Sequence, residues 1–146
     1  MANSVRIFRK LVISDLNMVL QMEGRFRSNF ICEKNAQVFL QNPMNWLFAC
    51  IQDNEIIAFA YGYEMNRLGS AGNMLYIHEV NVLPQYQRQG IGRRMLHNIK
   101  QQCKQKEMCK IFLFTEKSNL AACALYETMG GVPAHDDSVV YFFNEL

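Results

Sequence analysis

The 146-residue sequence lacks the patterns that mark several large classes of protein. Its five cysteines are odd in number and no two have C-x-x-C spacing, which argues against a zinc cage and against a disulfide framework. No apolar run approaches the roughly 20 residues of a membrane helix, and residues 1–10 lack the apolar core and cleavage site of a signal peptide. Free thiols in this number suit a reducing compartment, so we expect a cytoplasmic protein with no metal and no membrane partner.

The sequence also has no large excess of positive or negative charge. The formal net charge is +2, and lysine and arginine are scattered apart from a short stretch at residues 88–94, which argues against a nucleic-acid partner. The composition is 50% hydrophobic and 19% charged, an ordinary globular balance. The length fits one compact domain, which we expect to cover residues 1–146.

Hydrophobic periodicity predicts an alternation of strands and helices. The predicted strands are residues 5–10, 46–51, 56–63, 74–83, 111–115 and 139–143. The predicted helices follow the capping residues Ser14 and Asp15, cover residues 32–40 with Val38 and Phe39 inward, cover residues 90–106, and run from the cap Ser118 to about residue 129.

This order predicts an α/β fold in one domain, with a mixed, mostly antiparallel central sheet and helices on both faces. Polar residues 52–55 separate two apolar strands and predict a hairpin turn. The strand at 111–115 is almost continuously apolar, so we expect it to be buried on both faces.

The most informative stretch is the glycine-bearing turn that leads from the strand at 74–83 into the long helix. Such a turn leaves backbone N–H groups unpaired at a helix start, where the helix dipole favours an anion. Gly90 and Gly92 would let the backbone approach a ligand closely, and Arg88, Arg93 and Arg94 add positive charge. The turn therefore fits a pyrophosphate site, although a bare G-x-G also fits an ordinary strand–helix turn.

A dinucleotide-binding G-x-G-x-x-G loop is the alternative for this turn. Met95 occupies the third glycine position, and the strand before the turn follows hairpins instead of opening the fold. Glu116 lies about the right distance beyond for a ribose contact, so the loop alone leaves this alternative open. The chain is short, however, for a dehydrogenase with separate cofactor and substrate domains.

Two motifs carry a resemblance to a known family. Residues 87–92 read Gln-Arg-Gln-Gly-Ile-Gly, and residues 119–130 follow the pattern Asn-x-x-Ala-x-x-Leu-Tyr-x-x-x-Gly. On these motifs the sequence resembles the GCN5-related N-acetyltransferase (GNAT) superfamily over residues 74–131. Within that superfamily, the stretch at 76–82 and the short length look most similar to the type I aminoglycoside 3-N-acetyltransferases.

The resemblance implies that acetyl-coenzyme A (acetyl-CoA) is the cosubstrate. It places the thioester between splayed fourth and fifth strands, with a backbone N–H near Val82 facing the carbonyl oxygen and Leu83 pairing with the pantetheine arm. The full set of positions it assigns to acetyl-CoA is Val80, Val82, Leu83, Gln87, Arg88, Gln89, Gly90, Ile91, Gly92, Arg93 and Asn119.

The resemblance also assigns Tyr126 as the general acid that protonates the leaving thiolate. Helical spacing puts Ala122 and Gly130 on the same side, so a tyrosine packed in the core is the alternative. Asn119 fits either a contact to pantetheine or a helix cap.

Glu79 is the candidate general base and a candidate binder of a cationic substrate. A carboxylate within an apolar strand must meet water, a partner or a substrate, because burying it unpaired is costly. A salt bridge or a solvent-facing position is the alternative. Strand alternation places His78 on the opposite face, so we expect one of the two, and not both, to face the cleft. Asp136 and Asp137 precede the last predicted strand and are candidates for substrate binding, with a plain turn as the alternative.

These features predict an N-acetyltransferase that moves acetyl to the primary amine of a small molecule by direct attack in a ternary complex. An aminoglycoside is one candidate, which Arg25 and Arg27 disfavour because they would repel a cation. A protein or peptide N-acetyltransferase and a non-catalytic CoA-binding module are the alternatives. The aromatic strand at 139–143 would make a natural edge for pairing with a second copy, which predicts a homodimer.

Overall fold

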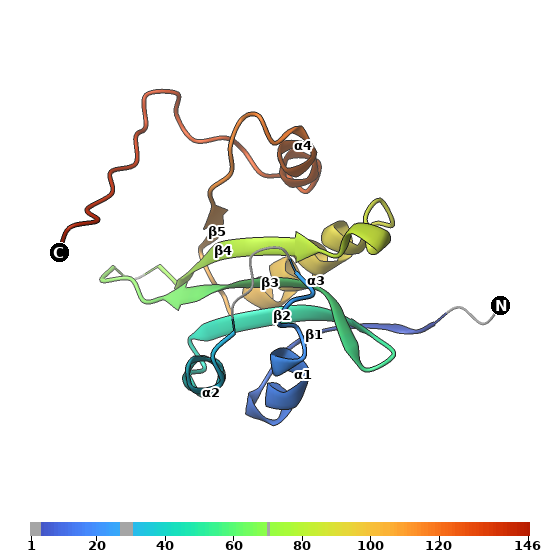
Figure 1. Cartoon of the computed structure of the whole chain (residues 1–146). Helices are drawn as coiled ribbons and strands as arrows, with labels where there is room; N and C mark the ends of the chain where they lie inside the picture. The colour runs from blue at the N-terminus through green and yellow to red at the C-terminus, as the bar shows by residue number, and fades with distance from the viewer. Residues whose placement is uncertain (1–3, 27–30, 70) are drawn as a thin grey trace.

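The structure is a computed structural model that describes residues 4–26, 31–69 and 71–146. Its centre is one five-stranded sheet in the order β1-β2-β3-β4-β5 (Figure 1). The strands are β1 (Arg6–Lys10), β2 (Asn45–Gln52), β3 (Glu55–Met65), β4 (Met74–Val82) and β5 (Lys110–Leu113). The first four strands pair antiparallel and β5 pairs parallel with β4. The mixed, mostly antiparallel sheet predicted from the sequence is confirmed.

Helices cover both faces of this sheet, as predicted (Figure 1). They are α1 (Leu16–Leu20), α2 (Glu33–Gln41), α3 (Ile91–Gln105) and α4 (Leu120–Thr128), with short 3-10 turns η1 (Ile13–Asp15) and η2 (Pro84–Tyr86). The long helix α3 lies on one face, and α1 and α2 lie on the other. In the part of the chain that the structure describes, no helix combines the length and the apolarity that crossing a membrane requires.

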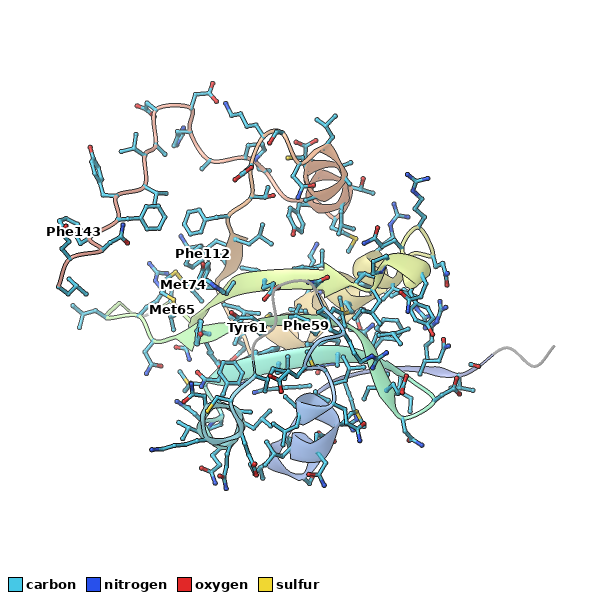
Figure 2. The ribbon with its side chains drawn as sticks, viewed as in Figure 1. Phe59, Tyr61, Met65, Met74, Phe112 and Phe143 are labelled. Atoms are coloured by element: carbon cyan, nitrogen blue, oxygen red, sulfur yellow. The ribbon has the colours of Figure 1, made fainter. Side chains whose placement is uncertain are left out.

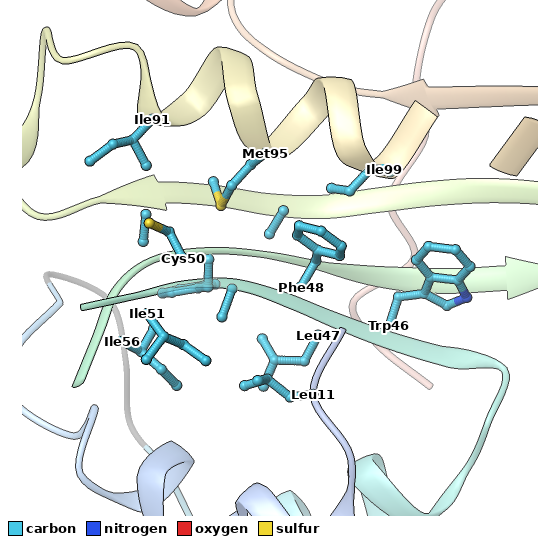
Figure 3. Close-up of a cluster of buried hydrophobic side chains, with 14 of the residues drawn as sticks. Leu11, Trp46, Leu47, Phe48, Cys50, Ile51, Ile56, Ile91, Met95 and Ile99 are labelled. Carbon is cyan, nitrogen blue, oxygen red and sulfur yellow. The ribbon is translucent and has the colours of Figure 1, made fainter. Parts of the chain in front are cut away.

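The core forms on both sides of β2 (Figure 3). Phe48 and Cys50 point toward Met95 of α3, whereas Leu47 and Ile51 point toward the side of α1 and α2. Strand alternation explains this arrangement, because a strand with helices on both faces needs apolar residues in both registers. Phe48, Cys50 and Met95 are fully excluded from solvent.

The hairpin turn between β2 and β3 is also confirmed. Asp53 and Asn54 have φ angles of 52° and 61°, a left-handed conformation that asparagine and aspartate tolerate better than most residues. Two such residues give the turn type whose twist matches that of the flanking strands.

The prediction for the last strand is wrong, and that for the strand before it is confirmed only in part. Residues 139–143 form no strand, and their exposed fractions are 57–79%, because no strand of the described chain lies beside them to pair with. The strand expected at 111–115 is shorter, Lys110–Leu113, and only half-buried. It is the edge strand of the sheet, and Phe114 just beyond it is 63% exposed, so its apolar residues are not covered on both faces.

Three local predictions are wrong as well. Val38 is exposed, whereas Phe39 does point inward and packs against the core. Asp15 occupies the N-cap position of α1, but its side chain makes no cap hydrogen bond there, because its carboxylate accepts hydrogen bonds from the guanidinium of Arg9 and the N–H of Val12. The cap of α4 is Asn119 and not Ser118.

Candidate active site

The sheet opens between β4 and β5. Their ladder ends at the pair Ile77 and Leu113, while β4 continues to Val82. In the described residues, no strand pairs with this last part of β4 on the β5 side. The splayed edge that the resemblance implies is therefore present.

Backbone groups of β4 point into this opening. The N–H of Leu83 donates to the carbonyl of Ile57 at 3.0 Å, so Leu83 faces β3. Because the direction of the backbone groups alternates along a strand, Val80 and Val82 face the open side. The side-chain amide of Gln87 donates to the carbonyl of Val82 at 3.1 Å, which agrees with that direction.

Leu83 itself is engaged within the protein on both sides. Besides its N–H bond to β3, its carbonyl accepts from the N–H of Tyr86 at 2.9 Å. The open edge therefore offers the backbone of Val80 and Val82, and not that of Leu83, to an incoming ligand.

The loop after β4 forms a cradle of backbone donors. The hydrogen bonds of the turn end with Gln87 N–H to Pro84 O, and the first helical bond is Arg94 N–H to Gly90 O at 3.0 Å. Within the described chain, no backbone N–H from Arg88 to Arg93 has a protein acceptor. Gly90 has a φ of 76°, the left-handed conformation that lets the chain turn sharply into α3. Such unpaired donors at a helix start suit a phosphate.

The side chains of the cradle divide into structural and solvent-facing groups. Ile91 is 2% exposed and belongs to the core, so it could bind a ligand only through its backbone. A Cβ on Gly92 would lie 3.2 Å from a methyl carbon of Leu125, so this glycine lets α4 pack closely against α3. Arg88 and Arg93 are exposed, which leaves their charges available for an anion.

Two further polar side chains of this loop serve the fold. Gln89 donates to the carbonyl of Gln85 at 3.2 Å and accepts a hydrogen bond from Arg6. Arg94 lies over the ring of Phe8, with 4.4 Å from guanidinium carbon to ring centroid. Gln89 thereby ties the loop to β1.

Helix α4 carries the second motif beside α3. Asn119 is its cap, and its side-chain oxygen accepts from the N–H of Ala122 at 3.1 Å. Tyr126 is half-buried against the core, and burial together with nearby Cys123 raises the pKa of its phenol above the usual value. A raised pKa keeps the phenol protonated at neutral pH, as a proton donor must be.

A pocket of about 410 Å³ opens on the other face of the sheet, between β3, β4 and the helices α1 and α2. Most of its lining is apolar or aromatic. The described lining residues are Val19, Met22, Ile31, Cys32, Asn35, Ala36, Phe39, Leu40, Leu47, Phe59, Tyr61, Tyr63 and Glu79. Glu79 alone among them carries a charge at neutral pH.

An irregularity in β4 decides how Glu79 and its neighbour lie. Tyr61 pairs with Glu79, but the next residue, Gly62, pairs with Ile77, so His78 is an extra residue in the ladder. A Cβ on Gly62 would come within 1.9 Å of the backbone of β4, so only glycine fits at this step.

The irregularity breaks the strict alternation assumed from the sequence. The ring of His78 lies 5.2 Å from that of Tyr61, and Glu79 stands directly opposite Tyr61. The two neighbours therefore do not lie on opposite faces. Glu79 lines the pocket, whereas His78 is exposed, with its Nδ1 3.0 Å from the hydroxyl of Tyr76.

Several groups set the surroundings of Glu79. The side-chain amide of Asn81 donates to its carboxylate at 3.3 Å. The pKa of the Tyr61 phenol is raised to about 12, mainly by burial and secondly by the negative charge of Glu79, so this phenol stays neutral. Asn81 was not recognised from the sequence, although its position two residues after Glu79 on the same strand puts both on one face.

The structure does not bring the other predicted acidic residues to the pocket. Asp136 and Asp137 form an exposed turn in the C-terminal segment and are absent from the pocket lining. Of the arginines near the expected acceptor site, Arg25 pairs with Glu55 at 3.3 Å, and Arg27 lies outside the described residues. Among the residues described, no three histidine, cysteine or carboxylate side chains gather as metal ligands would.

Solved structures resemble this fold over nearly its whole length. An aminoglycoside acetyltransferase from an uncultured soil metagenomic sample, in complex with trehalose, superposes with a TM-score of 0.82 at 23% identity, covering 97% of this chain and 96% of that one. A ribosomal-protein-alanine N-acetyltransferase from Brucella melitensis biovar Abortus 2308 superposes with a TM-score of 0.72 at 14% identity, covering 94% and 100%. At these identities the likeness shows a shared fold.

Sequence relatives are similar over a shorter stretch. The [ribosomal protein bS18]-alanine N-acetyltransferase of Escherichia coli (strain K12) is 37% identical over 54 residues, which is 37% of this chain and 36% of that protein. The match thus spans about a third of the length of this relative.

A match over most of the chain identifies the family. The model of the acetyltransferase (GNAT) family covers residues 13–131, which contain the opening between β4 and β5, the cradle and α4. The chain belongs to the acetyltransferase (GNAT) family.

Proposed function

We propose that this protein transfers the acetyl group of acetyl-CoA to the primary amine of a small molecule, by direct attack in a ternary complex. The observation that carries the proposal is the cradle of unpaired N–H groups from Arg88 to Arg93, beside the open edge of β4. The cradle suits the pyrophosphate of coenzyme A, and the backbone of Val80 and Val82 suits the pantetheine arm and the thioester carbonyl.

Glu79 and Tyr126 can accept the two protons that the acceptor nitrogen loses as the ammonium becomes an amide. The amine nitrogen attacks the carbonyl carbon, a C–N bond forms, and the C–S bond breaks to release the thiolate. Glu79 accepts the proton that the ammonium must lose before attack, directly or through water. Tyr126 protonates the thiolate, and the second proton, which the nitrogen loses as the amide forms, restores the Tyr126 phenol. Glu79 lies three residues before Val82 on β4, roughly 10 Å along the strand, so acceptor pocket and thioester site are neighbours.

The acceptor classes come from the relatives. Aminoglycoside acetyltransferases are among the similar structures, and one of them was solved with sisomicin. The similarity to type I aminoglycoside 3-N-acetyltransferases stays a prediction. The 37% identity to an alanine N-acetyltransferase favours a peptide amino terminus as the second candidate.

Isothermal titration with acetyl-CoA tests the cradle. We expect micromolar binding that weakens when Arg88 and Arg93 are both changed to alanine, because each removes a charge near the phosphates. The double variant Lys104→Ala and Lys110→Ala, which removes the same charge from exposed sites elsewhere, is the control. No binding at high micromolar acetyl-CoA would exclude the proposal.

Turnover tests the two side chains. With an amine that reacts, Tyr126→Phe and Glu79→Gln should each lower kcat by roughly 100-fold or more while acetyl-CoA still binds. Tyr141→Phe and Glu127→Gln remove the same groups from exposed positions and should leave kcat unchanged. If the double variant Tyr126→Phe, Glu79→Gln keeps full turnover, the assigned roles are wrong. Tight binding without release of CoA thiol from any amine would instead indicate a CoA-binding module.

A further inference from the structure

The pocket beside Glu79 carries very little charge for a site that is meant to receive an amine. Of the thirteen described residues that line it, Glu79 alone is charged at neutral pH. The other acidic candidates, Asp136 and Asp137, lie outside it. A second ammonium group in this pocket would find no carboxylate partner among the described lining residues, and moving an unpaired charge out of water is unfavourable.

Aromatic side chains form a large part of the pocket lining. Phe39, Tyr61 and Tyr63 contact one another edge to face, with centroid distances of 5.9 Å for the two pairs of Phe39 and 6.4 Å for the two tyrosines. Phe59 stacks on Tyr61, with 6.3 Å between ring centroids, and also lines the pocket. Figure 2 shows Phe59 and Tyr61 side by side on β3.

The cluster and the carboxylate stand next to each other. Tyr61 is in register with Glu79 and both line the pocket, so one side of the pocket offers a negative charge and an aromatic ring to the same bound group. An ammonium group is attracted to both, and the apolar part that carries it gains by contact with the rings. The volume of about 410 Å³ has room for a body of drug-like size.

We propose that the acceptor is a monocationic primary amine on an apolar or aromatic body, such as an arylalkylamine, and not a polycation. This proposal rests on the proposed acetyl transfer and names its substrate class. The ammonium lies at Glu79, and the body lies among Phe39, Tyr61 and Tyr63.

A panel of amines tests the class by release of CoA thiol from acetyl-CoA. We expect kcat/KM for 2-phenylethylamine to exceed that for 1,4-diaminobutane and for sisomicin by at least about tenfold. The aromatic amine gains by burying its ring, whereas the polycations must bring additional charge into an apolar pocket. A polycation or an alanyl peptide that equals or exceeds 2-phenylethylamine overturns the substrate class but leaves acetyl transfer intact. If acetyl-CoA binds and no amine reacts, acetyl transfer itself fails, and the substrate class with it.

A pocket variant tests the role of the rings. Tyr63→Ala should lower kcat/KM for 2-phenylethylamine by about tenfold, while that for methylamine, which has no body to contact the ring, falls much less. Tyr63 is 37% exposed, so its truncation should leave the fold intact, which thermal unfolding checks. Phe114→Ala removes an exposed ring outside the pocket lining and should change neither value. Equal losses for both amines in Tyr63→Ala overturn the proposal.

Discussion

The chain up to Cys103 and the chain after it differ sharply in burial. All fully buried residues in the described chain lie between Leu11 and Cys103, and none lies in residues 104–146. The later part contains β5, α4 and the C-terminal segment, which extend away from the rest of the sheet (Figure 1). Phe143 lies far out on that segment (Figure 2).

The candidate active site therefore has one part in the well-packed core and one part that is held by fewer buried contacts. The acceptor pocket and the cradle belong to β3, β4 and α3, which share the core. Asn119 and Tyr126 belong to α4, which has no fully buried residue. Regions with few buried contacts open most readily, so the part of the site that carries Tyr126, the proposed acid, should move more than the part that carries Glu79, the proposed base.

A core substitution should show the largest effect. Phe48 on β2 is completely buried, so Phe48→Ala should lower the free energy of unfolding by about 3–5 kcal/mol. The same truncation at Phe142, which is 79% exposed, should change it by less than about 0.5 kcal/mol. Urea unfolding at low protein concentration measures both. Similar losses would show that the C-terminal segment is packed in solution.

A buried carboxylate at the end of β3 should show the next effect. Glu64 is nearly buried and accepts from the indole of Trp46 at 3.3 Å, the ammonium of Lys106 at 3.2 Å and the amide of Asn73 at 3.4 Å. Burial alone would raise its pKa, but the three donors outweigh burial and lower it. Glu64→Gln should therefore cost about 1–3 kcal/mol at pH 7, because charge-assisted hydrogen bonds are lost.

The pH dependence of this effect follows from the lowered pKa. The carboxylate of Glu64 stabilises the fold fully above its unfolded pKa, and this contribution is lost as the pH falls through the lower folded pKa. The difference between wild type and Glu64→Gln should shrink below about pH 4. Glu127→Gln, at an exposed site on α4, should show no such pH-dependent difference. A constant difference between pH 7 and pH 3 would contradict the assignment.

The cap of α4 should show a smaller and local effect. Asn119→Ala removes the bond to the N–H of Ala122, which is worth about 1 kcal/mol to a helix. Because α4 shares no fully buried residue with the core, we expect faster amide exchange within α4 and little change in global unfolding. Hydrogen-exchange mass spectrometry measures the first and urea unfolding the second. Ser118→Ala is the control, and equal exchange in the two variants would contradict the cap.

The sequence predicted most of the fold because its signals were local. The apolar runs of β2 and β3, the polar turn at 52–55 and the amphipathic helix α3 depend on neighbours in the chain. The cradle could be located for the same reason, since Gly90 and Gly92 lie between a strand and a helix. The family motif, and not periodicity, identified Tyr126.

The missed features depend on contacts between distant segments. The extra residue at His78 in the pairing of β3 and β4 has no sequence signal apart from Gly62, whose partner strand was unknown. The pocket aromatics Tyr61 and Tyr63 followed a core pattern, and only the folded structure shows that they line a cavity together with Glu79. The strand predicted at 139–143 has the right composition but no partner strand within the described chain.

The smallest effect on folding is expected for the segment that differs most from the core. Removing residues 139–146 should change the free energy of unfolding of the monomer by less than about 0.5 kcal/mol, since these side chains are exposed.

Exposed apolar runs commonly mark interfaces, and β5 ends the sheet with a free edge in the described structure. If this segment pairs with a second copy, as the sequence predicts, the intact chain should sediment as a dimer and the shortened chain as a monomer. Val132→Ser, an equally exposed change outside the segment, should leave the dimer intact, and an intact chain that sediments as a monomer at high micromolar concentration would rule the dimer out.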